Sequence, residues 1–423
     1  MSEKKAEEKT DGKPGKWVLG TLTFSHLSQH FYVGAPILYS NAMMALGIDY
    51  AQIGIITGAS NILGGVLQMA YSIAARRYSR RVLLGVSNLI MSLGCFVMGI
   101  ANGFLGFLAG NSIAGLGQAG MHPMGTSIIA EKFGRKGVAG ALSTFYGLGY
   151  IGNIISPILL TLVAGLMGAN GWRFSLIILA VVPLVTGMTV ILYLRGEPAG
   201  RKIELEGERD SLWNSIKSSL RTRGALFILA AQSFITAGTG LGVITTWIPL
   251  YLREAATEGG LGIDPIQAGI ISAISTAGGV VGTIAIGHLA DRFGHLRTAI
   301  ACTVGTVVMV YPMTFYSSFT PIIIPHLFAL GVTCFSITSL LQAHLAIVSS
   351  PSQRDTLLGL FFTVGFGISS IWTTLMGFLI DEYRSFNPVW ILMAALGIVA
   401  IAMLFGAYRT MPKKEQAIQV AEH

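Results

Sequence analysis

Residues 48–56, IDYAQIGII, recur 215 residues later as residues 263–271, IDPIQAGII. The same offset matches Ser60, Gly64 and Val66 with identical residues, which gives nine identities in one ungapped register. Each copy leads into an apolar stretch that is long enough to cross a bilayer core of about 30 Å as a helix. The chain therefore consists of two related halves.

The composition of the whole chain fits a membrane protein. Of its 423 residues, 52 % are hydrophobic and 11 % are charged, whereas a soluble domain has about 25 % charged residues. The mean hydropathy is +0.65. These values exclude a disordered chain, a nucleic-acid binder and an ordinary cytosolic enzyme. All three cysteines lie inside apolar runs, so we expect no disulfide framework.

Twelve apolar stretches are long enough to span the membrane. They start near Trp17, Ala51, Val82, Phe104, Gly137, Trp172, Ala225, Pro265, Thr298, Pro321, Thr356 and Pro388. The sequence thus predicts an all-α polytopic membrane protein, built as two six-helix pseudo-repeats. Parallel repeats of this kind hold a substrate site near the membrane midplane, between the halves.

The distribution of Lys and Arg predicts the orientation. With both termini in the cytoplasm, 25 of the 28 basic residues fall on the cytoplasmic side, as the positive-inside rule requires. We expect the cell (inner) membrane as the location, with no signal peptide. The predicted parts are a cytoplasmic tail, a first bundle, a central loop, a second bundle and a second tail: residues 1–16, 17–194, 195–223, 224–408 and 409–423.

The loop at residues 287–295, GHLADRFGH, resembles the G-x-L-A-D-R-x-G-R signature of the major facilitator superfamily. Trp172-Arg173 at the start of span six also resembles that family. The chain also resembles the fosmidomycin-resistance branch of that superfamily, in His26 with Pro36 and in His122-Pro123. The resemblance implies the major facilitator fold, and the branch implies efflux of drugs or antibiotics driven by protons.

The first copy of the signature loop, residues 72–81, departs from the family pattern. Arg76 stands where the family has an Asp, which is implied to act as a cytoplasmic latch at a helix N-terminus of the opposite half. A carboxylate suits such a terminus and an Arg does not. We therefore predict a charge-swapped latch between Arg76 and Asp355, beside an ordinary one from Asp291 and Arg292 to the start of span five. The alternative is that the basic residues serve only the positive-inside rule.

Polar residues repeat at helical spacing on several spans. Because unpaired polar groups are costly in lipid, we expect these faces to line the bundle interior. The hydroxyl-rich stripes of the second half have an alternative role in helix–helix packing. The candidate substrate-binding residues are His26, Gln29 and His30 on span one, Asn111, Gln118 and His122 on span four, and Gln232 and Thr236 on span seven.

No Asp or Glu falls in the middle of a predicted span. A proton carrier must then be a histidine, whose unperturbed pKa is about 6.5, and His26, His30 and His122 are the candidates. A buried neutral histidine bonded to a backbone carbonyl is the structural alternative. The fosmidomycin-resistance branch typically has an Asp at the place of His30. A pair at i and i+4 can also bind zinc, but no Cys or carboxylate is expected nearby, so we predict no metal site.

These features predict a monomeric secondary transporter that moves a small organic molecule by alternating access, as a proton-coupled antiporter working in efflux. One alternative is a uniporter or exchanger for a small organic anion. Another is a membrane sensor that binds a ligand without transporting it. An enzyme is not expected, because the sequence has no nucleophile–base pair, phosphate loop or metal signature, and we predict no cofactor and no nucleic-acid partner.

Overall fold

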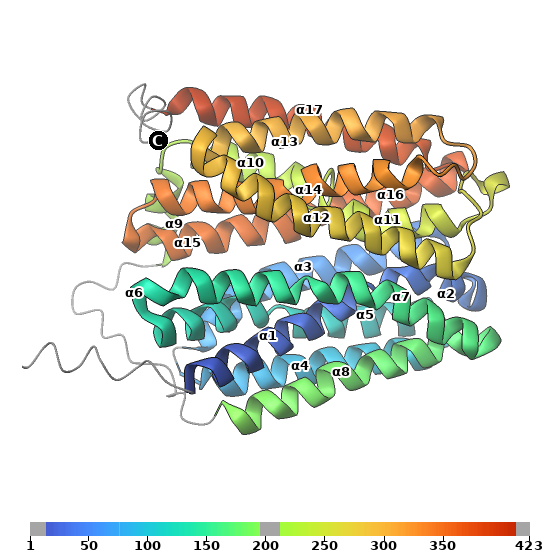
Figure 1. Ribbon diagram of the computed structural model, residues 1–423, viewed down its shortest axis with the longest axis horizontal. Coiled ribbons are helices and arrows are strands. Elements are labelled where there is room, and N and C mark those ends of the chain that lie inside the picture. The colour runs from blue at the N-terminus through green and yellow to red at the C-terminus, as the bar shows by residue number, and fades with distance from the viewer. Residues whose placement is uncertain (1–13, 76, 195–211, 412–423) are drawn as a thin grey trace, which may run out of the picture. The chain divides into compact units, whose positions relative to one another are not determined.

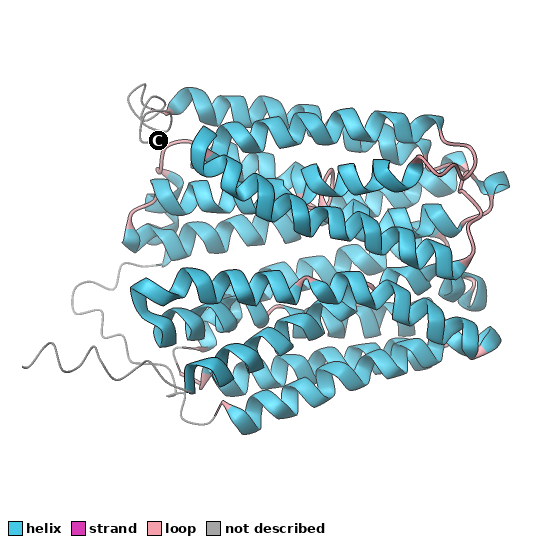
Figure 2. Ribbon diagram, in the orientation of Figure 1, coloured by secondary structure: helices cyan, strands magenta, loops and turns pink. Residues whose placement is uncertain are grey.

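The computed structural model describes residues 14–75, 77–194 and 212–411. Within these ranges the regular elements are all helices (Figures 1 and 2). Those preceding residue 195 are α1 (Pro14–Val33), η1 (Ala35–Leu38), α2 (Tyr39–Leu46), α3 (Tyr50–Ala74), α4 (Arg80–Ile100), α5 (Phe104–Gln118), α6 (Met121–Gly149), α7 (Ile151–Leu166), η2 (Gly168–Asn170) and α8 (Gly171–Tyr193).

The described residues after 211 continue the all-helical pattern. They form α9 (Leu212–Leu220), α10 (Ala225–Ile235), α11 (Leu241–Arg253), η3 (Ala256–Glu258), α12 (Pro265–Phe293), α13 (His295–Val310), η4 (Tyr311–Phe315), α14 (Ile323–Val348), α15 (Pro351–Phe362), the π-helical turn η5 (Thr363–Ile368), α16 (Ser370–Tyr383) and α17 (Asn387–Thr410).

In the described part of the chain, nine helical segments are long and apolar enough to cross a membrane. Three predicted spans are missing from that set, and the composition or an interruption of each one explains why. The span in α1 carries polar residues along its length, and two others are interrupted, between α5 and α6 and between α10 and α11. Counting these three, the structure accounts for all twelve predicted spans.

The sequence repeat is also a structural repeat. The helices α3 and α12 begin at Tyr50 and Pro265, which are 215 residues apart. The preceding aspartates cap both helices, since Asp49 accepts a 2.7 Å hydrogen bond from the amide of Gln52 and Asp264 accepts one of 3.0 Å from that of Ile266. A capping carboxylate satisfies amides that have no partner within the helix. The predicted all-α, two-repeat fold class is confirmed.

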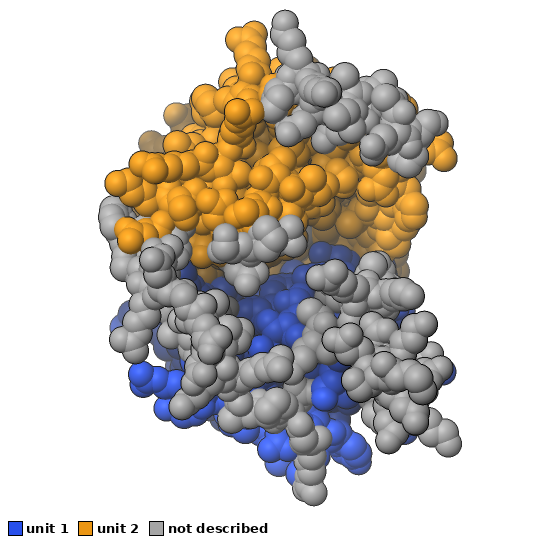
Figure 3. Space-filling model, turned by 90° about the vertical axis from the view of Figure 1, so that its left-hand side faces the viewer, with its two compact units in different colours: residues 1–35, 67–204 blue, residues 36–66, 205–423 orange. Residues whose placement is uncertain are grey.

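The chain forms two compact units (Figure 3). Unit 1 comprises residues 1–35 and 67–204, and unit 2 comprises residues 36–66 and 205–423. Each has its own apolar core, around Met121 and Phe145 in unit 1 and around Ile337 and Phe361 in unit 2. Residues 36–66 belong to the first half of the sequence but pack with the second, which places α2 and the start of α3 in unit 2.

Candidate functional site

The helix α1 presents three of the predicted residues to the interior of unit 1. His26, Gln29 and His30 have exposed fractions of 0 %, 2 % and 8 %. They occupy one face because residues three and four apart are neighbours on a helix. The partners of these side chains lie on α5, α6 and α7, so the buried polar face predicted for span one is present.

The helix α6 reverses its direction along its length. The rings of His122 and Tyr146 stack with their centroids 6.1 Å apart, although a straight helix would separate residues 24 positions apart by about 36 Å. The two arms of α6 therefore run back along each other (Figure 1). This reversal agrees with the predicted change from span four to span five near Gly137, and it brings both arms to α1.

A chain of hydrogen bonds crosses from α6 through α1 to α7. His26 Nδ1 lies 2.8 Å from the carbonyl oxygen of Phe145, and His26 Nε2 lies 3.0 Å from Nε2 of His30. At the other end, Nδ1 of His30 lies 2.8 Å from Oδ1 of Asn153. Asn153 is 3 % exposed, and its amide nitrogen has no hydrogen-bond partner among the described residues.

Aromatic rings enclose these histidines. The ring of Phe145 stacks on His26 at a centroid distance of 4.3 Å, and the ring of Tyr150 lies 4.8 Å from that of His30. His122 meets His26 edge-on at 5.3 Å. The structure therefore brings together all three histidines that the sequence singled out, and we call His26, His30, His122 and Asn153 the histidine cluster.

Glycines on the opposing helices make room for the cluster. A Cβ at Gly149 would lie 2.0 Å from Nδ1 of His26, and one at Gly152 would lie 2.8 Å from Cβ of His30. Any larger side chain at either position would displace a histidine. Gly149 and Gly152 are therefore required by the packing of His26 and His30.

The amides of the first half brace neighbouring helices. Span four is interrupted at residues 119–120, which frees the carbonyl of Gln118 to accept a 2.7 Å hydrogen bond from Nε2 of Gln29. Asn111 accepts a 2.7 Å hydrogen bond from the hydroxyl of Tyr32. Asn153, Tyr32 and Tyr150 were missed by the sequence reasoning. In the sequence each of them is only a polar or aromatic residue on an apolar span, and that pattern does not identify the residue to which it is bonded.

In unit 2 the predicted residues Gln232 and Thr236 are buried beside an irregular segment. Nε2 of Gln232 donates a 2.7 Å hydrogen bond to the Thr236 hydroxyl, and Oε1 of Gln232 has no partner among the described residues. The chain unwinds between α10 and α11, where the amide of Ala237 donates to Oγ of Ser369, just after the π-helical turn η5. π-helical turns are frequent at functional sites, so Gln232 and Thr236 remain candidate substrate-binding residues.

A second polar network in unit 2 joins the start of α3 to α11 and α16. The carboxylate of Asp381 accepts hydrogen bonds from the amides of Tyr50 and Ala51, at 3.2 Å and 2.6 Å. The hydroxyl of Tyr50 donates to Glu254. Arg253 donates to Oδ1 of Asn41 at 2.6 Å. We call these residues the α3 clasp, which the sequence alone did not reveal.

The predicted latches are described only in part. Arg76 and the side chain of Asp355 lie outside the described residues. Asp291 and Arg292 lie in the last turns of α12, and Oδ1 of Asp291 is 3.5 Å from Nε2 of His295, four residues on. Most of the predicted central loop, residues 195–211, and most of both tails are also outside the described ranges.

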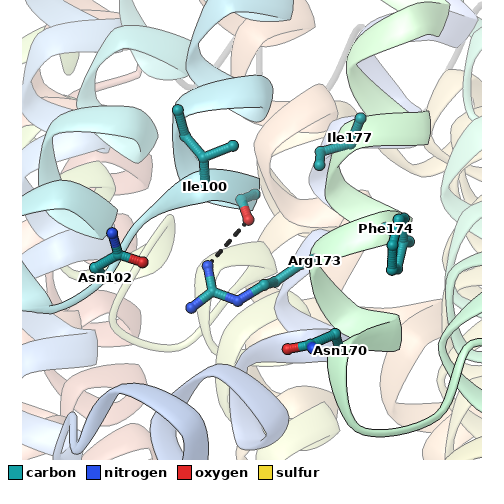
Figure 4. Close-up of a pocket in the computed structure, with 7 residues that line it drawn as sticks. Ile100, Asn102, Asn170, Arg173, Phe174 and Ile177 are labelled. Carbon is teal, nitrogen blue, oxygen red and sulfur yellow. Dashed lines mark hydrogen bonds between the residues drawn. The ribbon is translucent and has the colours of Figure 1, made fainter.

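The pocket drawn in Figure 4 lies elsewhere, between the end of α4 and the start of α8. It encloses about 450 Å³ and contains none of the predicted site residues. Its charged residue, Arg173, donates to the carbonyls of Gly99 and Ala101 and lies over the ring of Trp172. Arg173 thus ties two helix ends together. Among the described residues, no group of three or more His, Cys, Asp or Glu is arranged to hold a metal ion.

Two related halves of membrane-length helices, with buried polar groups in their interior, define a polytopic membrane protein of the secondary-transporter class. The sequence profile of the Major Facilitator Superfamily matches residues 22–259 and 254–422. The chain belongs to this superfamily. It is therefore a multi-pass membrane transporter that binds a small-molecule substrate within the membrane, and not an enzyme, as the sequence predicted.

Several relatives cover most of the chain. The probable sulfoacetate transporter SauU of Cupriavidus necator is 26 % identical in an alignment of 400 residues that covers 88 % of this chain and 88 % of its own. The MFS-type transporter YcaD of Escherichia fergusonii is 26 % identical over 84 % of this chain and 86 % of its own. The nitrite extrusion protein of Bacillus subtilis is 25 % identical over 62 % of this chain and 61 % of its own.

Solved structures share the fold. A bacterial homologue of the human lysosomal transporter Spinster superposes with a TM-score of 0.69 at 18 % identity, covering 95 % of this chain and 98 % of its own. The nucleoside transporter NupG gives a TM-score of 0.72 at 15 % identity, covering 93 % and 100 %. At such identities the likeness concerns the fold alone.

Proposed function

We propose that this chain is a proton-coupled secondary transporter of a small organic molecule that works by alternating access, with the histidine cluster as its proton-binding site. The observation that carries the proposal is the 3.0 Å contact between the ring nitrogens of His26 and His30, both of which are buried. Ionisable residues inside a membrane domain are expensive and mark proton or substrate pathways. The predicted spans have no central carboxylate that could take this role.

The proposed substrate site adjoins the cluster. His122, Gln118 and Asn111 from span four and Gln29 from α1 supply its polar groups in the first half. Gln29 and Asn111 are already bonded to Gln118 and Tyr32, so we assign them mainly to holding the site's shape. In unit 2, taken by itself, we propose Gln232 and Thr236 as further substrate-binding residues, because Oε1 of Gln232 is a buried acceptor with no partner among the described residues.

The α3 clasp supports the alternating-access part of the proposal. It binds residues 41, 50 and 51 of the first sequence half to residues 253, 254 and 381 of the second. By the distribution of basic residues, the clasp lies at the end that faces away from the cytoplasm, with both termini on the cytoplasmic side. We propose that it closes that end in the inner membrane and that it opens during the cycle. Arg76 with Asp355, and Asp291 with Arg292, would act at the cytoplasmic end.

For direction, we propose efflux by a monomer. Efflux follows from the resemblance of His26, Pro36, His122 and Pro123 to the fosmidomycin-resistance branch. The name of the Bacillus subtilis relative, a nitrite extrusion protein, also describes outward transport. The substrate panel should therefore contain both small drugs and small anions.

Proteoliposomes that enclose a pH-sensitive dye test the proposal. A substrate gradient from a panel of small drugs and organic acids is imposed on the wild type, His30→Ala and His122→Ala. The matched histidine control is His326→Ala, because His326 lies on α14 of unit 2, where its Nε2 is 2.6 Å from the carbonyl oxygen of Met309. We expect proton movement in the wild type and the control, and its loss in His30→Ala. Substrate flux without proton movement in the wild type would overturn the proposal, and binding without any flux would favour a sensor.

A uniporter or exchanger for a small organic anion is the second candidate. The relative named as a probable sulfoacetate transporter supports it, since sulfoacetate is a small organic anion. A protonated histidine in the cluster would supply the complementary charge. In the same liposomes this candidate predicts that a trans gradient of unlabelled anion accelerates anion flux while the dye signal stays flat.

A further inference from the structure

The protonation states of the two central histidines follow from their partners. A carbonyl oxygen only accepts hydrogen bonds, so Nδ1 of His26, 2.8 Å from the carbonyl of Phe145, must carry a proton. A neutral imidazole has one protonated nitrogen. Neutral His26 therefore presents a bare Nε2 to His30, and at 3.0 Å the facing Nε2 of His30 must supply the hydrogen between them.

The second nitrogen of His30 then depends on Asn153. If His30 is neutral with its proton on Nε2, its Nδ1 is bare and needs a donor, which is the NH₂ group of Asn153. If His30 is charged, Nδ1 also carries a proton and needs an acceptor, which is Oδ1 of Asn153. The structure has Oδ1 at 2.8 Å from Nδ1, and the NH₂ group has no partner among the described residues.

We propose that His30 is the residue that binds and releases the proton, that it does so at Nδ1, and that Asn153 accommodates both states by turning its amide through 180°. This inference rests on the proposed function and assigns the carrier within it. On release, the N–H bond at Nδ1 breaks, the lone pair stays on the ring, and the proton passes to water. The proton on Nε2 stays in place, and so does the hydrogen bond to His26.

Asparagine suits this task because its amide offers both a donor and an acceptor. An arrangement with Oδ1 facing the ring and both Nε2 atoms in contact is the one that a charged pair requires. His26 is then a positioning residue, because its bond to Phe145 fixes which of its nitrogens faces His30. The other titratable groups around the pair are His122 and Tyr146 from α6 and Tyr150 between α6 and α7.

Nitrogen-15 NMR of the full-length protein in lipid nanodiscs, labelled at its eight histidines, tests the assignment without any transport assay. Signals are assigned with single His→Gln variants and followed from pH 5 to pH 9. We expect Nδ1 of His26 to stay protonated throughout. We expect Nδ1 of His30 to lose its proton as the pH rises, which leaves the tautomer with the proton on Nε2.

Two variants of Asn153 sharpen the test. In Asn153→Asp the carboxylate only accepts and favours the charged ring, so the transition at Nδ1 of His30 should move up by about 1 to 3 pH units. In Asn153→Leu the charged ring loses its acceptor, and the transition should move down. Asn102→Asp, which adds a carboxylate at the pocket of Figure 4, should leave it unchanged.

Three results would overturn the assignment: a neutral His30 with its proton on Nδ1, an unchanged transition in Asn153→Asp, or a proton that titrates on His122 instead. These outcomes differ from a failure of the proposed function. Proton movement in liposomes together with titration of His122 would keep the function and reject His30. Titration of His30 with no proton movement would keep the assignment and reject proton coupling.

Discussion

The buried polar groups of the two units are bonded in different ways. In unit 1, His26 and His30 bond to Phe145 and Asn153 on other helices. In unit 2, hydroxyls such as those of Thr303 and Ser336 donate to carbonyls four residues back on their own helices. A group bonded within its own helix is satisfied whatever its neighbours do, whereas a bond between helices depends on their arrangement. The bonds of His26 and His30 in unit 1 therefore depend on how α1, α6 and α7 are arranged.

Unit 2 also has bonds between helices, such as that from Nε1 of Trp372 on α16 to the carbonyl of Ser233 on α10, and the α3 clasp is a further set of them. There Asp381, Glu254 and Arg253 reach the ends of other helices, and several of the groups involved are charged. The two units thus differ in what they contain. Unit 1 contains the buried histidine cluster, and unit 2 contains the hydrogen bonds that join the two halves of the sequence. Variants of each region should have separable effects.

The largest effect is expected from Gly149→Ala in unit 1. Its Cβ would lie 2.0 Å from Nδ1 of His26, so the ring must move away from both Phe145 and His30. Misplacement of a reacting group by about 1 Å can lower a rate by about 100-fold. We expect substrate-driven proton movement in proteoliposomes to fall by at least about that factor.

Gly147→Ala is the matched control, on the same helix. A Cβ at Gly147 meets no atom within 4 Å, and alanine favours a helix over glycine by about 1 kcal/mol. Proton movement should therefore equal that of the wild type. If Gly149→Ala also transports protons normally, the geometry of His26 does not matter and the contrast between the units is lost.

An intermediate effect is expected from Asp381→Ala in the α3 clasp. The variant leaves the amides of Tyr50 and Ala51 without their acceptor. Loss of a capping side chain typically costs about 0.5–2 kcal/mol. We expect hydrogen–deuterium exchange of a peptide that starts several residues before residue 50 and contains residues 50 and 51 to accelerate by about 2- to 30-fold.

Glu382→Ala controls for charge, because Glu382 is the adjacent, exposed carboxylate. It should leave exchange at residues 50 and 51 unchanged. Equal acceleration in both variants would mean that general charge, and not the bonds of Asp381, protects the start of α3. Proton binding at His30 should be the same in both variants if the two units act separately.

The sequence predicted the elements of this protein better than their contacts. Local patterns were enough to predict three features: the repeat at residues 48–56 and 263–271, the lengths of the apolar stretches, and the polar face with His26 and His30. Asn153 lies 123 residues from His30 in the sequence. No local pattern predicts that α7 packs against α1, so this contact could not be predicted. The interruption at residues 119–120 and the π-helical turn η5 also escaped prediction, since both break the periodicity from which helices are read.

The smallest effect is expected from Ser336→Ala on α14 of unit 2. Ser336 is fully buried, and its hydroxyl donates to the carbonyl of Val332 at 2.8 Å. That carbonyl also belongs to the helix ladder, so alanine removes a redundant bond and leaves no buried donor behind. We expect substrate flux within about twofold of the wild type and a change in unfolding free energy below about 1 kcal/mol. A tenfold loss of flux in liposomes would instead place substrate against α14, and the hydroxyls of unit 2 would then belong to the binding site rather than to helix packing.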